Sequence, residues 1–119
     1  MFNFEKLDVW QHAIDFADLA YTLTRSFPAD ERFGLTNQMR RAAVSVSSNI
    51  AEGSARMSRD DFARFVEIAT GSLFEVVSQS VIARRQGFLT PEQQGQIYDT
   101  AENLGKQLSG LRRSLKADG

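Results

Sequence analysis

The residues with the greatest capacity for chemistry lie in Gln38–Gly53, a segment rich in serine and arginine. Four of its polar residues recur every three or four positions and would share one face of a helix, with Asn49 beside them: Arg41, Ser45, Ser48 and Glu52. On one hypothesis they form a buried polar network that fixes helix register, in which Asn49 bonds a neighbouring helix and Glu52 pairs with an arginine. Glu75 is the third candidate member of this network. On the other hypothesis, the arginines face outward and bind phosphates.

Arginines are concentrated in the middle of the chain. The formal net charge is −1, but residues 32–64 hold six arginines against three acidic residues, so a local basic region lies inside a nearly neutral protein. The candidate phosphate contacts in this region are Arg40, Arg41, Arg56, Arg59 and Arg64. Because the sequence indicates no basic surface studded with aromatic side chains, we expect recognition of shape or charge rather than stacking of bases.

No arrangement of residues in the sequence predicts catalysis. Cysteine is absent and His12 is the only histidine, so we expect neither a metal site nor a cofactor. Three serines lie close together but lack the Gly-x-Ser-x-Gly elbow of a nucleophile: Ser45, Ser47 and Ser48. Three glutamates could supply the paired carboxylates that acid–base catalysis needs, but they are explained equally well as partners for arginine: Glu52, Glu67 and Glu75. We therefore expect a protein that is not an enzyme.

These residues must be positioned by helices, because helical periodicity is the dominant pattern along the chain. It predicts helices over about 8–26, 35–52, 59–86 and 91–115. Pro28 ends the first, Ser58 caps the third, Gly87 ends the third, and Thr90-Pro91-Glu92-Gln93 is a capping box that starts the fourth. Short connections favour one all-α domain over 1–119, an up-down-up-down antiparallel four-helix bundle.

Two of the predicted helices carry more apolar surface than a single buried face requires. Segment 8–26 has two apolar stripes, and segment 59–86 has Ile68, Phe74 and Val81 outside its core stripe. Small residues predict close helix packing at Gly53, Gly71 and Ser72. Gly53 is also a candidate for the left-handed residue that follows a helix.

The chain has no pattern of export or membrane insertion. The N-terminal residues lack a basic segment followed by an apolar run, and no apolar stretch approaches the roughly 20 residues that span a bilayer. Together with the absence of cysteine, these observations favour a cytoplasmic protein without a membrane partner.

Two blocks of the sequence resemble a known family. Gln38–Gly53, with its ending Asn49-Ile50-Ala51-Glu52-Gly53, and the block Ile68–Glu75 are similar to signatures of the four-helix-bundle proteins encoded by intervening sequences of bacterial 23S ribosomal RNA. Leu7–Gln11 and Phe27-Pro28 fit as well, so the resemblance covers almost the whole chain. One departure is Val76-Val77, where the family continues with leucine and an acidic residue.

The resemblance implies a homopentameric ring of four-helix protomers. It also implies a relation to the accessory variability determinants of diversity-generating retroelements, which bind nucleic acid through a basic pentameric barrel. A ring would bury the surplus apolar faces and repeat each arginine around an axis. We therefore expect a non-enzymatic homo-oligomeric adaptor for RNA or DNA, with structured RNA preferred. The alternative is a scaffold that binds a protein partner and no nucleic acid.

Overall fold

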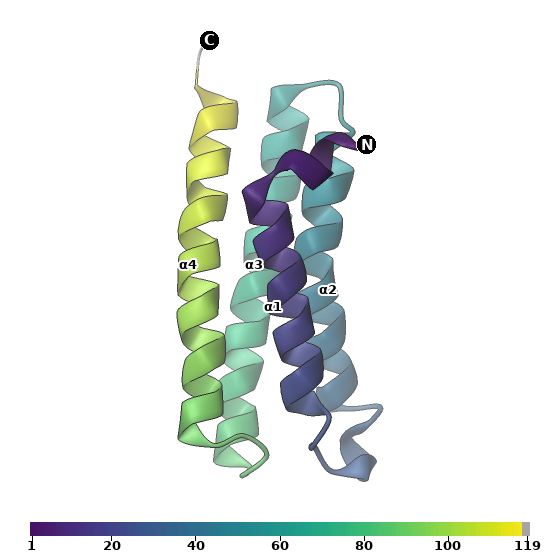
Figure 1. Cartoon of the computed structure of the whole chain (residues 1–119), viewed down its shortest axis with the longest axis vertical. Coiled ribbons are helices and arrows are strands. Elements are labelled where there is room, and N and C mark those ends of the chain that lie inside the picture. The colour runs from purple at the N-terminus through teal and green to yellow at the C-terminus, as the bar shows by residue number, and fades with distance from the viewer. Residues whose placement is uncertain (118–119) are drawn as a thin grey trace.

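The computed structural model describes residues 1–117, and its regular elements are helices (Figure 1). The four long helices are α1 (Asp8–Thr24), α2 (Leu35–Ser54), α3 (Arg59–Arg85) and α4 (Pro91–Lys116). Two short 3-10 helices precede α1 and α2, η1 (Asn3–Lys6) and η2 (Ala29–Glu31). Every long helix begins at the predicted residue, and each end lies within two residues of the prediction. The predicted fold class is therefore confirmed.

The helices run alternately up and down and form a square bundle of about 48 × 22 × 21 Å (Figure 1). Each helix packs on the next along the chain, and α1 closes the square against α4. The α2–α3 contact is the most extensive of the four and the α1–α4 contact the least. The connections α1–α2 and α3–α4 lie at one end of the bundle, and the connection α2–α3 lies at the other end with both termini.

Local capping explains the helix boundaries. The Ser58 hydroxyl accepts the backbone N–H of Asp61 at 3.0 Å, and the Thr90 hydroxyl accepts that of Gln93 at 3.1 Å. Gln93 returns a bond to the backbone of Thr90, which completes the predicted capping box. Gly87 follows α3 with a φ of +80°, a conformation that glycine adopts without steric cost.

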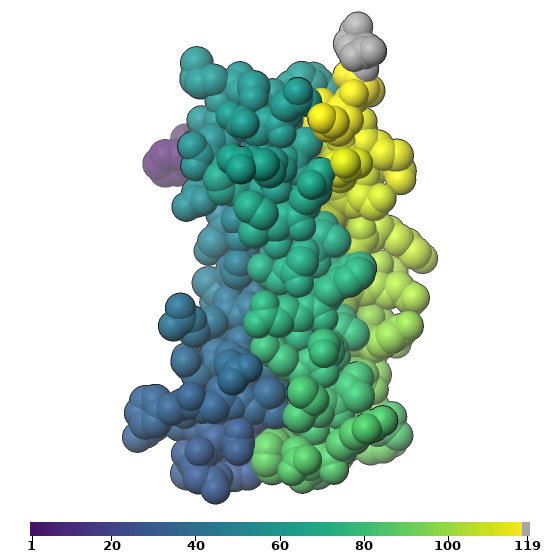
Figure 2. All heavy atoms as spheres, turned by 180° about the vertical axis from the view of Figure 1, so that it is seen from behind, coloured from purple at the N-terminus to yellow at the C-terminus, as the bar shows by residue number. Residues whose placement is uncertain are grey.

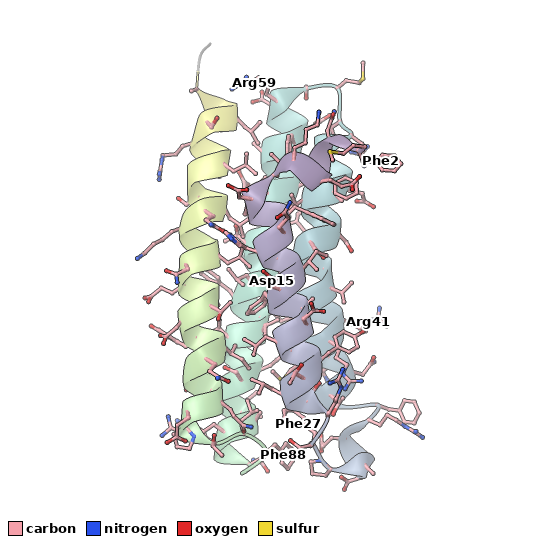
Figure 3. The ribbon with its side chains drawn as sticks, in the orientation of Figure 1. Phe2, Asp15, Phe27, Arg41, Arg59 and Phe88 are labelled. Carbon is pink, nitrogen blue, oxygen red and sulfur yellow. The ribbon has the colours of Figure 1, made fainter. Side chains whose placement is uncertain are left out.

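The core is a single apolar cluster contributed by all four long helices. Its largest fully buried side chains include Phe16, Met39, Ile50, Leu73 and Leu108. At the end of the bundle that holds the α1–α2 and α3–α4 connections, the rings of Phe27 and Phe88 pack with centroids 5.5 Å apart (Figure 3). The periodic apolar positions thus close the bundle along its length, and two connection residues close one end.

Two glycines that were predicted to lie at close helix crossings have different surroundings. A Cβ on Gly53 would lie 2.8 Å from both Phe62 Cδ1 and Phe65 Cβ, so close packing of α2 on α3 is confirmed there. The prediction that Gly53 follows the helix is wrong, because it is buried within α2. The prediction for Gly71 is also wrong within the protomer, since no atom lies within 4 Å of a Cβ built there. Ser72 does face α2, where its hydroxyl lies 2.9 Å from that of Ser45.

Replacing these two glycines by alanine is expected to change stability in opposite directions. Gly53→Ala gains about 1 kcal/mol of helix propensity but must separate α2 from α3, which costs about 1–3 kcal/mol. Gly71→Ala is expected to raise the free energy of unfolding by about 0.5–1 kcal/mol, because it gains propensity without a clash. Urea denaturation at one protein concentration measures both. If Gly53→Ala raised the free energy of unfolding, close packing of α2 on α3 at Gly53 would be contradicted.

Helix α3 has a second surface that the bundle does not cover. By length and composition it is apolar enough to cross a membrane, although 39% of the relevant window is buried inside the protomer. The expectation that no apolar stretch is long enough to span a bilayer is therefore wrong by this criterion. The core helix of a soluble protein passes the same criterion. The exposed large side chains on α3 are Ile68, Phe74, Val81 and Ile82, and Tyr98 of α4 is exposed as well.

Candidate nucleic-acid interface

A basic hollow lies along α2 and the α1–α2 connection. It is an open groove of about 840 Å³, which we name the arginine groove. Its lining combines three arginines, two aromatic rings and several small polar or apolar side chains: Arg32, Arg40, Arg41, Tyr21, Phe33, Thr36, Asn37, Val44, Ser45 and Ser48. Carboxylates are absent from the lining residues identified within 1–117. Its charged lining groups are therefore all cationic.

Arg40 is held in place by α1. Its Nε–H donates to the hydroxyl of Thr24 at 2.9 Å, and its guanidinium lies over the ring of Tyr21, 4.6 Å from the centroid. Thr24 is buried, and its hydroxyl donates in turn to the carbonyl of Ala20 at 2.7 Å. A guanidinium has five N–H donors, so most of those on Arg40 are left for a ligand. The groove therefore contains a cation whose position is set before anything binds.

Arg32 and Phe33 enter the groove from the α1–α2 connection. The Arg32 guanidinium lies 5.1 Å from the centroid of the Phe33 ring. This connection is fixed to α2 by Glu31, whose carboxylate accepts the backbone N–H of Leu35 at 3.1 Å. In the space-filling view the connection projects in blue from the lower left of the molecule (Figure 2). The carboxylate of Glu31, which is next to Arg32 in the sequence, is therefore already bonded to the start of α2.

Arg41 is the exposed cation of the groove. It lies on the outward face of α2, and Figure 3 shows it at the edge of the bundle. Within residues 1–117 it makes no ion pair, since the pairs found there are Arg112–Glu67 at 2.6 Å and Lys116–Asp60 at 2.9 Å. A side chain in this position can reach a phosphate without losing a bond inside the protein.

The other three predicted phosphate contacts lie away from the groove. Arg59 is at the end of the bundle that holds the termini, far along the molecule from Arg41 (Figure 3). From Arg41 to the end of α2 at Ser54 alone is about 20 Å of helix. Arg59 donates to the carbonyls of Ser114 and Leu115 and so helps to cap α4. The five arginines of the prediction therefore do not form one patch.

Arg56 and Arg64 belong to the same distant end of the bundle. The Arg56 guanidinium lies 4.5 Å from the centroid of the Phe65 ring, and Arg64 is exposed on α3. Neither residue lines the arginine groove. Of the predicted contacts, the fold brings only Arg40 and Arg41 together, and it adds Arg32 to them.

The predicted polar network is smaller than expected and is arranged differently. Asn49 donates to the carbonyl and hydroxyl of Ser45 on its own helix, at 2.8 and 2.9 Å, and the link to α3 passes from Ser45 to Ser72. The expected direct bond from Asn49 to a neighbouring helix is therefore wrong. Glu52 is exposed and has no ion pair within residues 1–117, so the expected pair with an arginine does not form there.

Glu75 is not part of this network either. It accepts a bond from the amide of Gln79 at 3.1 Å on its own helix, one turn away. The other amide atom, Gln79 Oε1, is buried without a partner among the described residues. Among the described residues, the three predicted members thus do not bond one another, and only Asn49 contributes to a link between α2 and α3.

Three of the charged and aromatic residues that line the groove were not predicted from the sequence: Tyr21, Arg32 and Phe33. They come from α1 and from the α1–α2 connection, outside Gln38–Gly53, whereas α2 supplies Arg40 and Arg41. The expectation of a basic surface without aromatic side chains is therefore wrong. The adjacent pair Arg32-Phe33, next to a helix break, was a signal available in the sequence.

A smaller polar site lies between α1 and α4. The side-chain amide of Gln107 is within hydrogen-bonding distance of His12 Nδ1. Asp15 and Thr100 line the same hollow. The part of the chain that the structure describes contains no group of three histidine, cysteine, aspartate or glutamate side chains able to hold a metal ion.

Comparisons with known proteins agree with the fold. The family model described as "23S rRNA-intervening sequence protein" matches residues 5–110. A solved structure described as a protein of unknown function from the S23 ribosomal protein family of Bacteroides thetaiotaomicron aligns with a TM-score of 0.81. The two chains are 24% identical over 88% of this chain and 95% of the other, so this likeness supports the fold alone. No curated protein matches the sequence.

Proposed function

Because the chain belongs to the 23S rRNA-intervening sequence protein family, we propose that it is a non-enzymatic, homo-oligomeric adaptor that binds nucleic acid, preferably RNA. The binding surface is the arginine groove. The adaptor acts in the cytoplasm, where RNA is available to it. Its contribution is to hold the nucleic acid, which requires a charged and shaped surface rather than a reactive group.

The observation that carries this proposal is the convergence of Arg32, Arg40 and Arg41 on one hollow surface whose lining holds no described carboxylate. Arginine presents planar donors that match phosphate oxygens, and neighbouring guanidinium groups favour a ligand with repeated negative charge. A polynucleotide carries such charge at every residue. The polar hydroxyls of Ser45 and Ser48 on the same surface add donors suited to phosphate and sugar oxygens.

Assembly into a ring strengthens this charge. The protomer has a formal net charge of −1, so one copy has little long-range attraction for nucleic acid. The exposed apolar face of α3 and α4, which includes Phe74 and Tyr98, supports contact with another protomer. The exposed side of α1, where Trp10 and Ile14 are half-buried, is available as the second face that a cyclic interface requires. We propose a homopentamer, in which each arginine is repeated around the axis.

Reversing the charge of Arg41 tests the binding surface. Arg41→Glu is expected to weaken the binding of a labelled RNA at 50 mM salt by about tenfold or more, because it removes a phosphate contact and repels the strand. Arg113→Glu makes the same change of charge near the end of α4 and is the matched control. Fluorescence anisotropy measures both dissociation constants.

The two variants separate a local contact from a general effect of charge. Both side chains are exposed, so neither substitution should alter the fold. An equal loss of affinity in both variants would mean that overall charge, and not the arginine groove, determines binding. An unchanged affinity of Arg41→Glu would remove the groove as the site.

The alternative is a protein-binding scaffold, and the exposed face around Phe74 is the observation that favours it. A hollow of about 380 Å³ beside Phe74 and Tyr98 has a mostly apolar lining. On this alternative, a different protein covers that face. Light scattering on the purified chain separates the two: a stable single copy at micromolar concentration favours the scaffold, and a closed oligomer favours the adaptor.

A further inference from the structure

We infer that the arginine groove takes unpaired nucleotides, with one base stacked on the ring of Phe33. The inference rests on the proposed function and makes it more specific, because it names the form of nucleic acid that the site selects. It replaces the expectation of recognition by charge and shape alone. The geometry of two aromatic rings and three guanidinium groups carries it.

Phe33 is an unusual residue to find on a free surface. Its side chain is 85% exposed, the most exposed aromatic side chain in residues 1–117. The Arg32 guanidinium lies 5.1 Å from its ring centroid, so one face of the ring is next to a cation. Phe33 belongs to the α1–α2 connection, which projects from the side of the molecule (Figure 2). The second face of the ring is therefore available to a planar ligand.

Tyr21 and Arg40 repeat this combination deeper in the groove. The Arg40 guanidinium is 4.6 Å from the centroid of the Tyr21 ring and is bonded to the buried hydroxyl of Thr24. Alternating rings and cations are the composition of surfaces that bind single strands, in which bases stack and phosphates pair. Arg41 lies on the same surface and supplies a further cation for the backbone of the strand.

A duplex does not fit this arrangement. In a base-paired helix the faces of the bases are covered by their neighbours, so an aromatic side chain on a protein surface cannot stack on them. The three arginines alone would bind duplex phosphates, but Phe33 would then remain exposed without a role. An acidic peptide would also pair with the arginines and would not need an exposed ring.

Anisotropy with short labelled oligonucleotides tests the inference on the whole chain. The probes are an oligouridine RNA and an oligothymidine DNA of about twelve nucleotides, which is within the range that such surfaces cover. A duplex of the same length and a polyglutamate peptide complete the set. At 50 mM salt the wild-type chain is expected to bind at least one of the single strands more tightly than it binds the duplex or the peptide.

Variants of Phe33 give the decisive comparison. Phe33→Ala is expected to weaken binding of the preferred single strand by about tenfold while leaving duplex binding unchanged. Phe33→Trp keeps a stacking ring and should retain the affinity. Met57→Ala removes a fully exposed apolar side chain at the opposite end of the bundle and should change neither affinity. A loss of affinity for the single strand without a loss for the duplex supports the inference, whether the single strand is RNA or DNA. The strand that shows it is the preferred nucleic acid.

The failures of the inference and of the proposed function are distinguishable. If Phe33→Ala binds the single strand as tightly as wild type while Arg41→Glu binds weakly, the inference is overturned and the function stands. Equal weakening of single-strand and duplex binding by Phe33→Ala also overturns the inference. If neither strand nor duplex binds, or if polyglutamate binds most tightly, both are overturned.

Discussion

Raising the salt concentration from 50 to 200 mM is expected to lower the affinity of the proposed pentamer for a long single-stranded RNA by about four orders of magnitude. If five protomers each neutralise about two phosphates, the logarithm of the binding constant should fall with the logarithm of salt at a slope of about −7. The physical reason is the release of ions condensed on the strand, which salt opposes. A titration by anisotropy at constant pH measures the slope.

A variant designed to prevent the proposed assembly is the control for this slope. Phe74→Asp places a charge in the exposed apolar face of α3, where Phe74 is 66% exposed and its replacement should not disturb the core. Its single groove should give a slope of about −1 to −2. Light scattering confirms its size beforehand. An identical slope in the two proteins would show that the ring adds no charge to the site, and binding insensitive to salt would remove phosphate contacts from the proposal.

Leu108→Ala is expected to lower the free energy of unfolding by about 3 kcal/mol. Leu108 is completely buried in the apolar cluster, so its truncation removes apolar contacts and leaves a cavity. Helix α4 depends on its packing for order, because Gly95, Gly105 and Gly110 weaken its intrinsic helix propensity. Urea denaturation followed by circular dichroism measures the change.

Leu115→Ala is the matched control for this substitution. It removes the same atoms from the same helix, but Leu115 is only half-buried near the end of α4. Its cost should therefore be smaller than that of Leu108→Ala. Both must be measured at one protein concentration, so that any contribution of the proposed assembly to apparent stability is the same in the two variants. If the two variants lost equal free energy of unfolding, or if Leu108→Ala left the urea midpoint unchanged, the buried position of Leu108 in the core would be contradicted.

The helices and their boundaries were predictable because the signals for them are local. Ser58 and Thr90 each bond a backbone N–H three residues away, so their role is written in adjacent sequence. The apolar period of α4 likewise predicts which of its sides faces the core. The glycines show the limit of local signals: Gly53 and Gly71 are the same residue type in helices, but only one meets a neighbouring helix.

The candidate site was only half predictable. Arg40 and Arg41 could be named from the basic segment, but Arg59 lies in the same segment and instead bonds the last carbonyls of α4. Which cations face a ligand and which serve the fold depends on the partners that packing brings near. Phe33 and Tyr21 join the groove because α1 and the connection pack beside α2.

The sequence by itself determined that the chain forms four helices, where they begin and end, which family it belongs to and that its middle is basic. Each of these follows from interactions between residues a few positions apart, or from a pattern along the chain. The tertiary structure decided which arginines converge, which glycine is tight and which aromatic rings border the groove. Those outcomes depend on how helices distant in sequence align against one another, and the alignment is set by packing of the whole core.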